Sequence, residues 1–309
     1  MKQKTLSLLI LLIFLAAYLS GRSQTSDNSV DVKPHWKVDE AHSVKIITTT
    51  SDFSNGKTQN YISNFEANFK VLAITDSGYQ VEWTYTDSKL ANNEPVLESQ
   101  IIAKLINVKM IIRLSNTGRF KELINVNDVK AFADKSVDEL IAGSSSNPTM
   151  NIQYKAAKQL ITTKKGLEIA LLKQIKFYNF SFGFTYKLDY VQTNDIKFPN
   201  PLGGQPFDAV EKVQLTKLDN KSSTCVIETN KTIDGNAVKA AVIEYVKKIS
   251  KADAKTIDDE IGKANLEISE STMQQIEFSK GLVQKSFFKR TMNLGFQNRT
   301  SVLEIETLD

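Results

Sequence analysis

The sequence predicts an α+β fold: a large curved antiparallel sheet with helices packed on one face. Stretches of alternating apolar and polar residues, separated by Gly- or Asn-containing turns, run through most of the chain after residue 42. Three intervening regions have the apolar spacing of amphipathic helices. The chain has 309 residues, which is enough for a substantial core.

The N-terminus has the pattern of a secretory signal peptide. Two lysines precede an apolar run from Leu6 to Leu19, and small or polar residues follow it. The run is shorter than the roughly 20 residues of a membrane-spanning helix. We therefore expect residues 1–23 to be cleaved and the protein to be exported, periplasmic or secreted, with no integral membrane span. No cysteine is present there for a lipid anchor, and the polar residues 24–34 are expected to be a disordered lead-in.

Strand signals begin after this lead-in. "SVKIITTTSDF" and "TQNYISNFEANFKVLAI" flank Asn55-Gly56, a strong short signal for a hairpin. A turn at residues 76–78 leads into "YQVEWTYTD", in which Trp83 and Tyr85 share the apolar face. A further hairpin is expected to turn at residues 115–118.

Helical spacing comes next. Apolar residues from Val129 to Ile141 form one stripe, with Asp128 as a candidate N-cap. A second helical region is expected from Ile152 to Ile175, interrupted near Gly166.

An aromatic row follows in "KFYNFSFGFTYKLDY". Its alternate residues are Tyr178, Phe180, Phe182, Phe184, Tyr186, Leu188 and Tyr190. A strand of this length would span roughly 43 Å, against a usual length of about 5–6 residues. We expect a long bent strand or two pieces, with the bend at Gly183. The row is either the wall of a ligand site or one buried face, and alternation alone favours the buried face.

The stretch "PNPLGGQP", residues 199–206, is rich in Pro and Gly and is predicted to be a linker. It would join two similar halves, about 35–198 and 207–309, of a single domain over 35–309. The second half contains hairpin turns at Asp219-Asn220 and Lys280-Gly281, a helix near 238–249, and a final strand "TSVLEIETL". The similarity of the two halves is explained either by pseudo-duplication of a hairpin-helix-hairpin unit or by the general likeness of amphipathic hairpins.

A resemblance to known proteins is carried by the leader, the "LSNTGRFKEL" hairpin, the "FYNFSFG" step and the "PNPLGGQPF" linker. In these features the chain resembles uncharacterised exported β-rich proteins of Bacteroidota-type bacteria. These motifs are turns and packing residues, so the resemblance implies no activity, cofactor or functional residue. The helix-crossed sheet is also similar in architecture to the incomplete barrels of lipoprotein carriers. A fold by itself does not fix a function.

The charge balance argues against nucleic acid as a partner. The formal net charge is +4, but Lys2, Lys4 and Arg22 of the leader account for three positive charges. The remainder is nearly neutral and gives no electrostatic footprint for nucleic acid. The single cysteine, Cys225, shares strand parity with Ile227 and is predicted to be a buried small hydrophobe rather than a reactive thiol.

No motif supports catalysis, so no catalytic residue, metal ligand or cofactor is predicted. His35 and His42 are the only histidines, their spacing matches no metal motif, and no G-x-S-x-G elbow occurs. The acid-rich stretch 253–260 has lysines interleaved, as on a solvated helix face. Gly203-Gly204 lies between prolines and indicates a plain bend.

Three functions follow as hypotheses. The first is an exported non-enzymatic envelope protein, an interaction or assembly module that pairs with an envelope partner through exposed strand edges. The second is a binding or carrier protein for an apolar or amphipathic ligand such as lipid. Its candidate ligand-binding residues are Phe180, Phe182, Phe184, Tyr186, Trp83 and Tyr85. The third, a carboxylate-dependent hydrolase, is disfavoured by the absent motifs.

Overall fold

A computed structural model describes residues 28–54, 56–91, 97–144, 148–249, 253–264, 266–295 and 297–308. The predicted signal peptide lies outside these residues. Within the described part of the chain, none of the helices is both long and apolar enough to cross a membrane.

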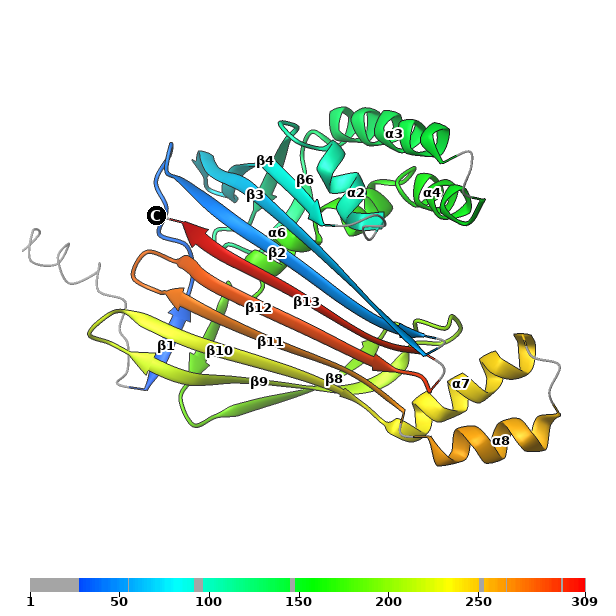
Figure 1. Ribbon diagram of the computed structural model, residues 1–309. Coiled ribbons are helices and arrows are strands. Elements are labelled where there is room, and N and C mark those ends of the chain that lie inside the picture. Colours follow the sequence, from blue (N-terminus) through cyan, green and yellow to red (C-terminus); the bar gives the residue numbers. More distant parts are fainter. Residues whose placement is uncertain are drawn as a thin grey trace, which may run out of the picture.

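The described strands form one sheet of eleven antiparallel strands and one of two (Figure 1). The order in the large sheet is β6-β5-β4-β3-β2-β13-β12-β11-β10-β9-β8. Its strands are β2 (Ala41–Ser54), β3 (Lys57–Thr75), β4 (Gly78–Ala91), β5 (Lys109–Leu114), β6 (Phe120–Leu123), β8 (Val191–Phe198), β9 (Phe207–Asp219), β10 (Thr224–Ile233), β11 (Glu267–Glu277), β12 (Leu282–Asn293) and β13 (Gln297–Leu308). The small sheet pairs β1 (Ser29–Val32) with β7 (Phe184–Lys187). The predicted α+β class with a large antiparallel sheet is confirmed.

The helices fall into two groups in Figure 1: one near β4 and β6, the other beyond the ends of β8 and β13. The first group is α2 (Leu97–Lys104), α3 (Val126–Gly143), α4 (Pro148–Leu160), α5 (Lys164–Leu171) and α6 (Lys173–Tyr178), and the second is α7 (Gly235–Ile249) and α8 (Ala254–Lys263). Ile268 and Gln274 lie on the same face of β11, where the first packs with α7 and the second bonds to residues of α6. Both groups therefore reach one face of the sheet.

Most predicted turns are where the sequence placed them. Ser54 pairs with Lys57, Thr75 with Gly78 and Glu277 with Leu282, so three predicted hairpins are confirmed. The helices predicted near 129–141 and 238–249 are α3 and α7. The break in the second helical region lies at residues 161–163, where the Thr163 hydroxyl caps α5 by accepting from Gly166 N at 3.0 Å. The α2 helix was not predicted.

The aromatic row is neither a long bent strand nor two strand pieces, and that prediction was wrong. Residues 173–178 form α6, a turn follows, and only residues 184–187 are extended as β7. The helical spacing of Leu171, Ile175 and Tyr178 prevails because all three are buried in the main core. Gly183 has φ +83° and does mark the bend, as predicted.

Two further segments differ from expectation. Residues 29–32 of the predicted disordered lead-in form β1, with Val30 and Val32 buried against the core. The predicted linker 199–206 is the loop of the β8–β9 hairpin, where Phe198 pairs with Phe207. A pseudo-duplication of two halves is not confirmed.

A buried glutamine joins α6 to the sheet. The Gln274 side chain is fully buried, and its Nε2 donates to the carbonyl oxygens of Phe177 at 2.9 Å and Tyr178 at 3.3 Å. Its Oε1 accepts from Ser181 N at 3.1 Å, and its Nε2 also donates to Ser286 Oγ at 2.8 Å. The last carbonyls of a helix lack partners within that helix. This strand side chain therefore adds hydrogen bonds at the end of α6, where the Phe177 carbonyl also accepts from Phe180 N at 3.1 Å, and it bonds the turn that follows at Ser181.

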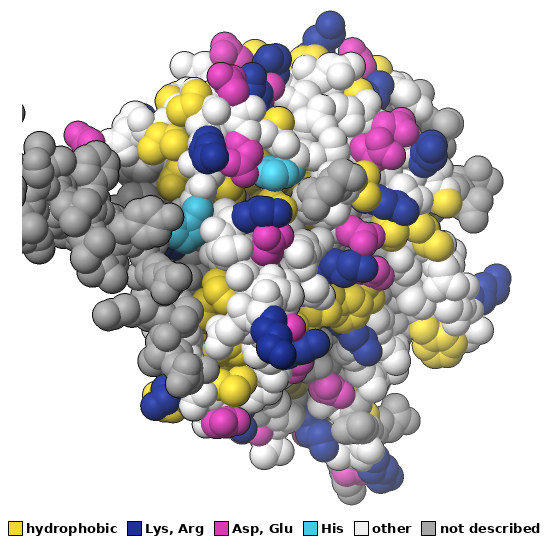
Figure 2. Space-filling view, turned by 90° about the vertical axis from the view of Figure 1, so that its left-hand side faces the viewer, with side chains coloured by type: hydrophobic (Ala, Val, Ile, Leu, Met, Phe, Trp, Pro, Cys, Tyr) yellow, Lys and Arg dark blue, Asp and Glu magenta, His cyan; other side chains and the backbone are white. Residues whose placement is uncertain are grey.

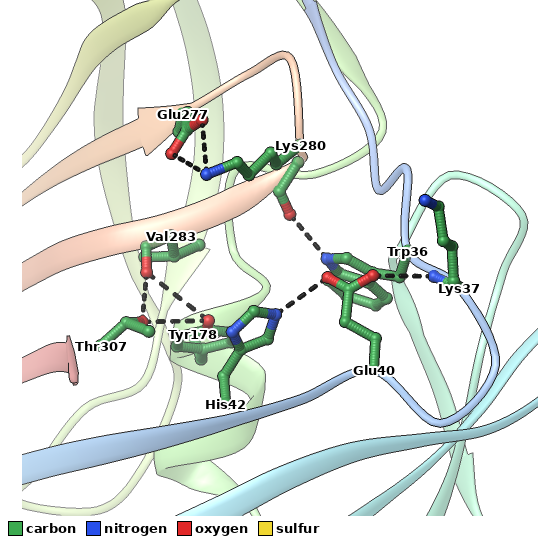
Figure 3. A network of polar contacts seen from close by, with 10 residues as sticks. Trp36, Lys37, Glu40, His42, Tyr178, Glu277, Lys280, Val283 and Thr307 are labelled. Carbon is green, nitrogen blue, oxygen red and sulfur yellow. Dashed lines mark hydrogen bonds and ion pairs between the residues drawn. The ribbon is translucent and has the colours of Figure 1, made fainter. Parts of the chain in front are cut away.

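The segment before β2 passes across the β11–β12 turn (Figure 3). The Trp36 indole donates to the Gly281 carbonyl at 2.9 Å and packs edge-on against Phe69 and Phe182, with ring centroids 4.8 and 5.7 Å away. A Cβ on Gly281 would lie 2.3 Å from the Lys33 carbonyl oxygen. Only glycine allows this approach.

We predict that Gly281→Ala lowers the free energy of unfolding by about 2–4 kcal/mol, because it adds a backbone clash to the cost of a positive φ. Gly56→Ala is the matched control: its φ is +72° and nothing lies within 4 Å of its added Cβ. The control is expected to lose about 1 kcal/mol, measured by denaturant unfolding. Equal losses in the two variants would show that the crossing segment does not constrain the turn.

We also predict that Gln274→Leu lowers the free energy of unfolding by at least about 3 kcal/mol, because each buried group left without a partner costs about 1–3 kcal/mol. Its neighbour Gln275, which bonds Gln284 at 2.8 Å and is not fully buried, provides the control Gln275→Leu. The control is expected to change stability by less than about 1 kcal/mol. Similar values for both variants would contradict the role given to Gln274.

Candidate ligand-binding site

Three of the six predicted site residues lie in the core. Trp83, Tyr85 and Phe182 are each 0% exposed. The Tyr85 hydroxyl donates to Gln174 Oε1 at 2.7 Å, and burial raises the pKa of this phenol. Trp83 packs against Tyr178 of α6 with ring centroids 5.9 Å apart. Trp83 and Tyr85 thus contact α6 inside the curved sheet, and none of the three residues lines the pocket formed by the other predicted site residues.

The other three residues meet at a pocket of about 190 Å³. Its lining residues are Arg119, Phe180, Phe184, Tyr186, Gln192, Asn194, Glu211 and Val213. Arg119 directly precedes the edge strand β6, while Gln192 and Asn194 lie on the opposite edge strand β8. Both edges of the large sheet therefore contribute to one pocket, with β7 between them.

The aromatic walls differ in exposure. Phe184 is 41% exposed at the mouth, whereas Tyr186 is 8% exposed and donates its hydroxyl to the Ser181 carbonyl at 3.0 Å. Burial raises the pKa of Tyr186, so this phenol stays neutral at physiological pH. Phe180 is half-buried between them. The pocket thus combines a rigid, buried ring with an accessible one.

Arg119 is held over the pocket by three contacts. Its backbone N–H donates to Ser115 Oγ at 3.1 Å, and its guanidinium carbon lies 4.6 Å from the Phe184 ring centroid. A Cβ on Gly183 would lie 2.7 Å from Arg119 Cδ, so the aliphatic stem packs where only glycine leaves room. Arg119 forms no ion pair with any other residue that the structure describes.

A row of paired charges crosses the sheet beside the pocket. Lys231 Nζ lies 3.8 Å from Glu211 Oε1 and 3.3 Å from Glu270 Oε2, and Arg290 Nε donates to Glu270 Oε1 at 2.7 Å. These residues are register partners on β9, β10, β11 and β12. Two acids and two bases balance, and Asn194 Nδ2 adds a hydrogen bond to Glu211 at 3.2 Å. Glu211, the only carboxylate among the described lining residues, therefore already has a cationic partner.

Two further hollows are relevant, one next to the pocket and one beside α7. One of about 310 Å³ adjoins the pocket and shares Tyr186, Gln192 and Val213 with it. A larger one of about 600 Å³ lies between the 199–206 loop and α7, where Ala237, Ala240 and Ala241 form part of the wall. None of the predicted site residues reaches the larger hollow.

The remaining chemistry-bearing residues are dispersed. His42 Nε2 lies 2.9 Å from Glu40 Oε1, while His35 has its pKa lowered by burial and by Lys33 (Figure 3 shows His42 and Glu40). Asp258 on α8 pairs with Lys247 at 2.8 Å. Cys225 is fully buried, as predicted, and burial raises the pKa of its thiol to about 12. Among the described residues, no group of three or more His, Cys, Asp or Glu could hold a metal.

The face on the left of Figure 1, at the β9–β10 and β11–β12 turns, carries basic and acidic side chains intermixed with apolar ones (Figure 2). This arrangement gives no single-sign field over that face.

The sequence did not single out Arg119, Asn194 or Glu211. A usable signal existed for one of them, because "AVEKVQL" alternates and places Glu211 and Val213 on the same face of β9. Arg119 follows a hairpin turn, and nothing local indicates that the turn lies against Gly183.

No protein-family model and no curated protein matches the chain. Lipovitellin, in a structure presented as one of lipid–protein interactions, is similar with a TM-score of 0.45 and 11% identity, covering 89% of this chain and 26% of its own. The chain thus spans about a quarter of lipovitellin. A Vibrio parahaemolyticus domain assigned to outer-membrane lipoprotein sorting has a TM-score of 0.17 and 9% identity, covering 87% of this chain and 84% of its own.

A porin-like protein from Bacteroides uniformis has a TM-score of 0.16 and 6% identity, covering 85% of this chain and 95% of its own. The lipoprotein-sorting domain loosely matches the expected likeness to lipoprotein carriers. At TM-scores below 0.5, none of these likenesses carries an argument about function.

Proposed function

We propose that the protein is an exported, non-enzymatic binding protein that takes one end of a small amphipathic molecule into the pocket at Phe180, Phe184 and Tyr186. The observation that carries the proposal is the convergence of these three rings with Arg119 and Asn194, from both edges of the sheet, around an open space. Concave apolar walls with a few polar groups are the usual form of a small-molecule site.

The size of the pocket narrows the ligand. Sites for drug-sized molecules are about 300–1,000 Å³, and this pocket is about 190 Å³. It has room for one apolar end of a molecule, while the adjoining hollow of about 310 Å³ extends the path past Tyr186.

The test uses N-phenyl-1-naphthylamine, an uncharged apolar probe that fluoresces when it leaves water. We expect saturable binding to the full exported chain and about five- to tenfold weaker binding by Phe184→Ala, since a tenfold change corresponds to about 1.4 kcal/mol. The control is Phe53→Ala, a phenylalanine of β2 that is 48% exposed and outside the pocket. If the wild type shows no saturable binding, or both variants weaken it equally, the proposal fails.

A second candidate function is an assembly module acting through β8. Among the described strands, β8 is an edge of the large sheet, paired with β9 alone, and Val191 is 46% exposed. An exposed edge strand is a template for an added strand. A strand added there would cross the mouth of the pocket, because Gln192 and Asn194 of β8 line it.

The simplest partner for β8 is a second copy of the chain, which sedimentation velocity over a range of concentrations would detect. We expect Val191→Lys to weaken such a dimer at least about tenfold, because charge on an edge opposes strand addition. Val210→Lys, on β9 with partners on both sides, is expected to leave it unchanged. A wild type that stays monomeric at all concentrations would remove self-assembly through this edge.

A further inference from the structure

We infer that the ligand is an amphipathic oxyanion, a carboxylate or a phosphate monoester with an apolar tail, and that Arg119 binds its headgroup. This inference rests on the proposed function and adds to it the charge of the ligand. The argument combines the charges at the pocket, the position of Arg119 and the chemistry of its guanidinium.

The charges at the pocket do not cancel. Glu211 is the only acid among the lining residues that the structure describes, and it is paired with Lys231 and hydrogen-bonded by Asn194. Lys231 and Arg290 together balance Glu211 and Glu270. Arg119 has no ionic partner among the described residues, so the pocket presents one uncompensated positive charge.

The Arg119 side chain is also already positioned at the pocket before a ligand binds. Its stem lies against Gly183, its guanidinium stacks over Phe184, and its backbone is tied to Ser115. A side chain ordered before binding loses less conformational entropy when a ligand arrives. The guanidinium fork then suits the two oxygens of a carboxylate or phosphate, which it can bind in bidentate fashion.

The same arrangement disfavours a cationic ligand. An ammonium group would approach Arg119 at the mouth, and it would have to displace Lys231 to gain the full charge of Glu211. A neutral alcohol would gain the aromatic contacts but not the ion pair. The order of affinity for one fixed tail is therefore set by the headgroup.

The experiment compares octanoate, octyl phosphate, 1-octanol and octylammonium as competitors of N-phenyl-1-naphthylamine at neutral pH and low salt. We expect one or both anions to compete about three- to tenfold better than octanol, as for a partly solvated ion pair, and octylammonium to be the weakest. Raising the salt concentration should remove the advantage of the anion and leave octanol unchanged. Whichever anion binds better identifies the headgroup source.

The variants isolate the charge. Arg119→Met keeps an apolar stem and is expected to bring the anions to the level of octanol, while Arg119→Lys retains part of the preference. The control is Arg113→Met. It removes an arginine of β5 that pairs with Glu122 of β6, and it should behave as wild type.

The two proposals fail in different ways. If octanoate and octyl phosphate compete no better than octanol, or if Arg119→Met keeps the preference, the inference about Arg119 is overturned while the apolar site stands. If the apolar probe does not bind and none of the four competitors has an effect, the proposed function fails and this inference fails with it.

Discussion

The structure depends on how the buried amide of Gln274 joins the end of a helix to a strand. The short helix α6 enters the concavity of the sheet, where a buried backbone carbonyl or N–H left without a partner is costly. Gln274 accepts and donates at once, bonding Phe177, Tyr178 and Ser181 from the middle of β11. An apolar residue at this position could fill the same space, but it could not form these hydrogen bonds. The chain therefore leaves α6 in one direction, toward Phe182 and Gly183.

The pocket follows from that direction. Beyond Ser181, Phe182 enters the cluster of Trp36 and Phe69, and Gly183 turns the chain into β7, which pairs with β1. The aromatic side chains of this stretch then point in two directions. Phe182 faces the core, and the side chains that face the gap between β6 and β8 are Phe180, Phe184 and Tyr186. The concave face is largely filled, and the pocket is the space left where the two sheet edges approach β7. The adjacent row of charges is paired within itself, so the net charge at the pocket comes from Arg119.

The sequence predicts the hairpins and the α+β class well because those signals are local: Asn55-Gly56 and Lys280-Gly281 set turn geometry within four residues. It predicts the aromatic row poorly, since period 2 and the helical period overlap around Tyr178. The helix prevails through a tertiary effect, the burial of Leu171, Ile175 and Tyr178 in the main core. The lead-in looks polar, yet Val30 and Val32 become buried once β7 is present to pair with them. Half of the predicted site residues lie in the pocket, and Arg119 reaches it only through tertiary contact with Gly183. The sequence did not decide between an interaction module and a ligand-binding protein, because no motif carries either function.

The most direct test is to map the site by NMR on the isotopically labelled protein titrated with octanoate. The account predicts that the shifting backbone and side-chain N–H signals cluster at Arg119, at residues 180–186, and at Gln192, Asn194, Glu211 and Val213, with the Arg119 Nε–H signal moving most. Shifts centred instead on residues 199–208 and α7, beside the larger hollow, would contradict it, as would small shifts scattered over the whole surface.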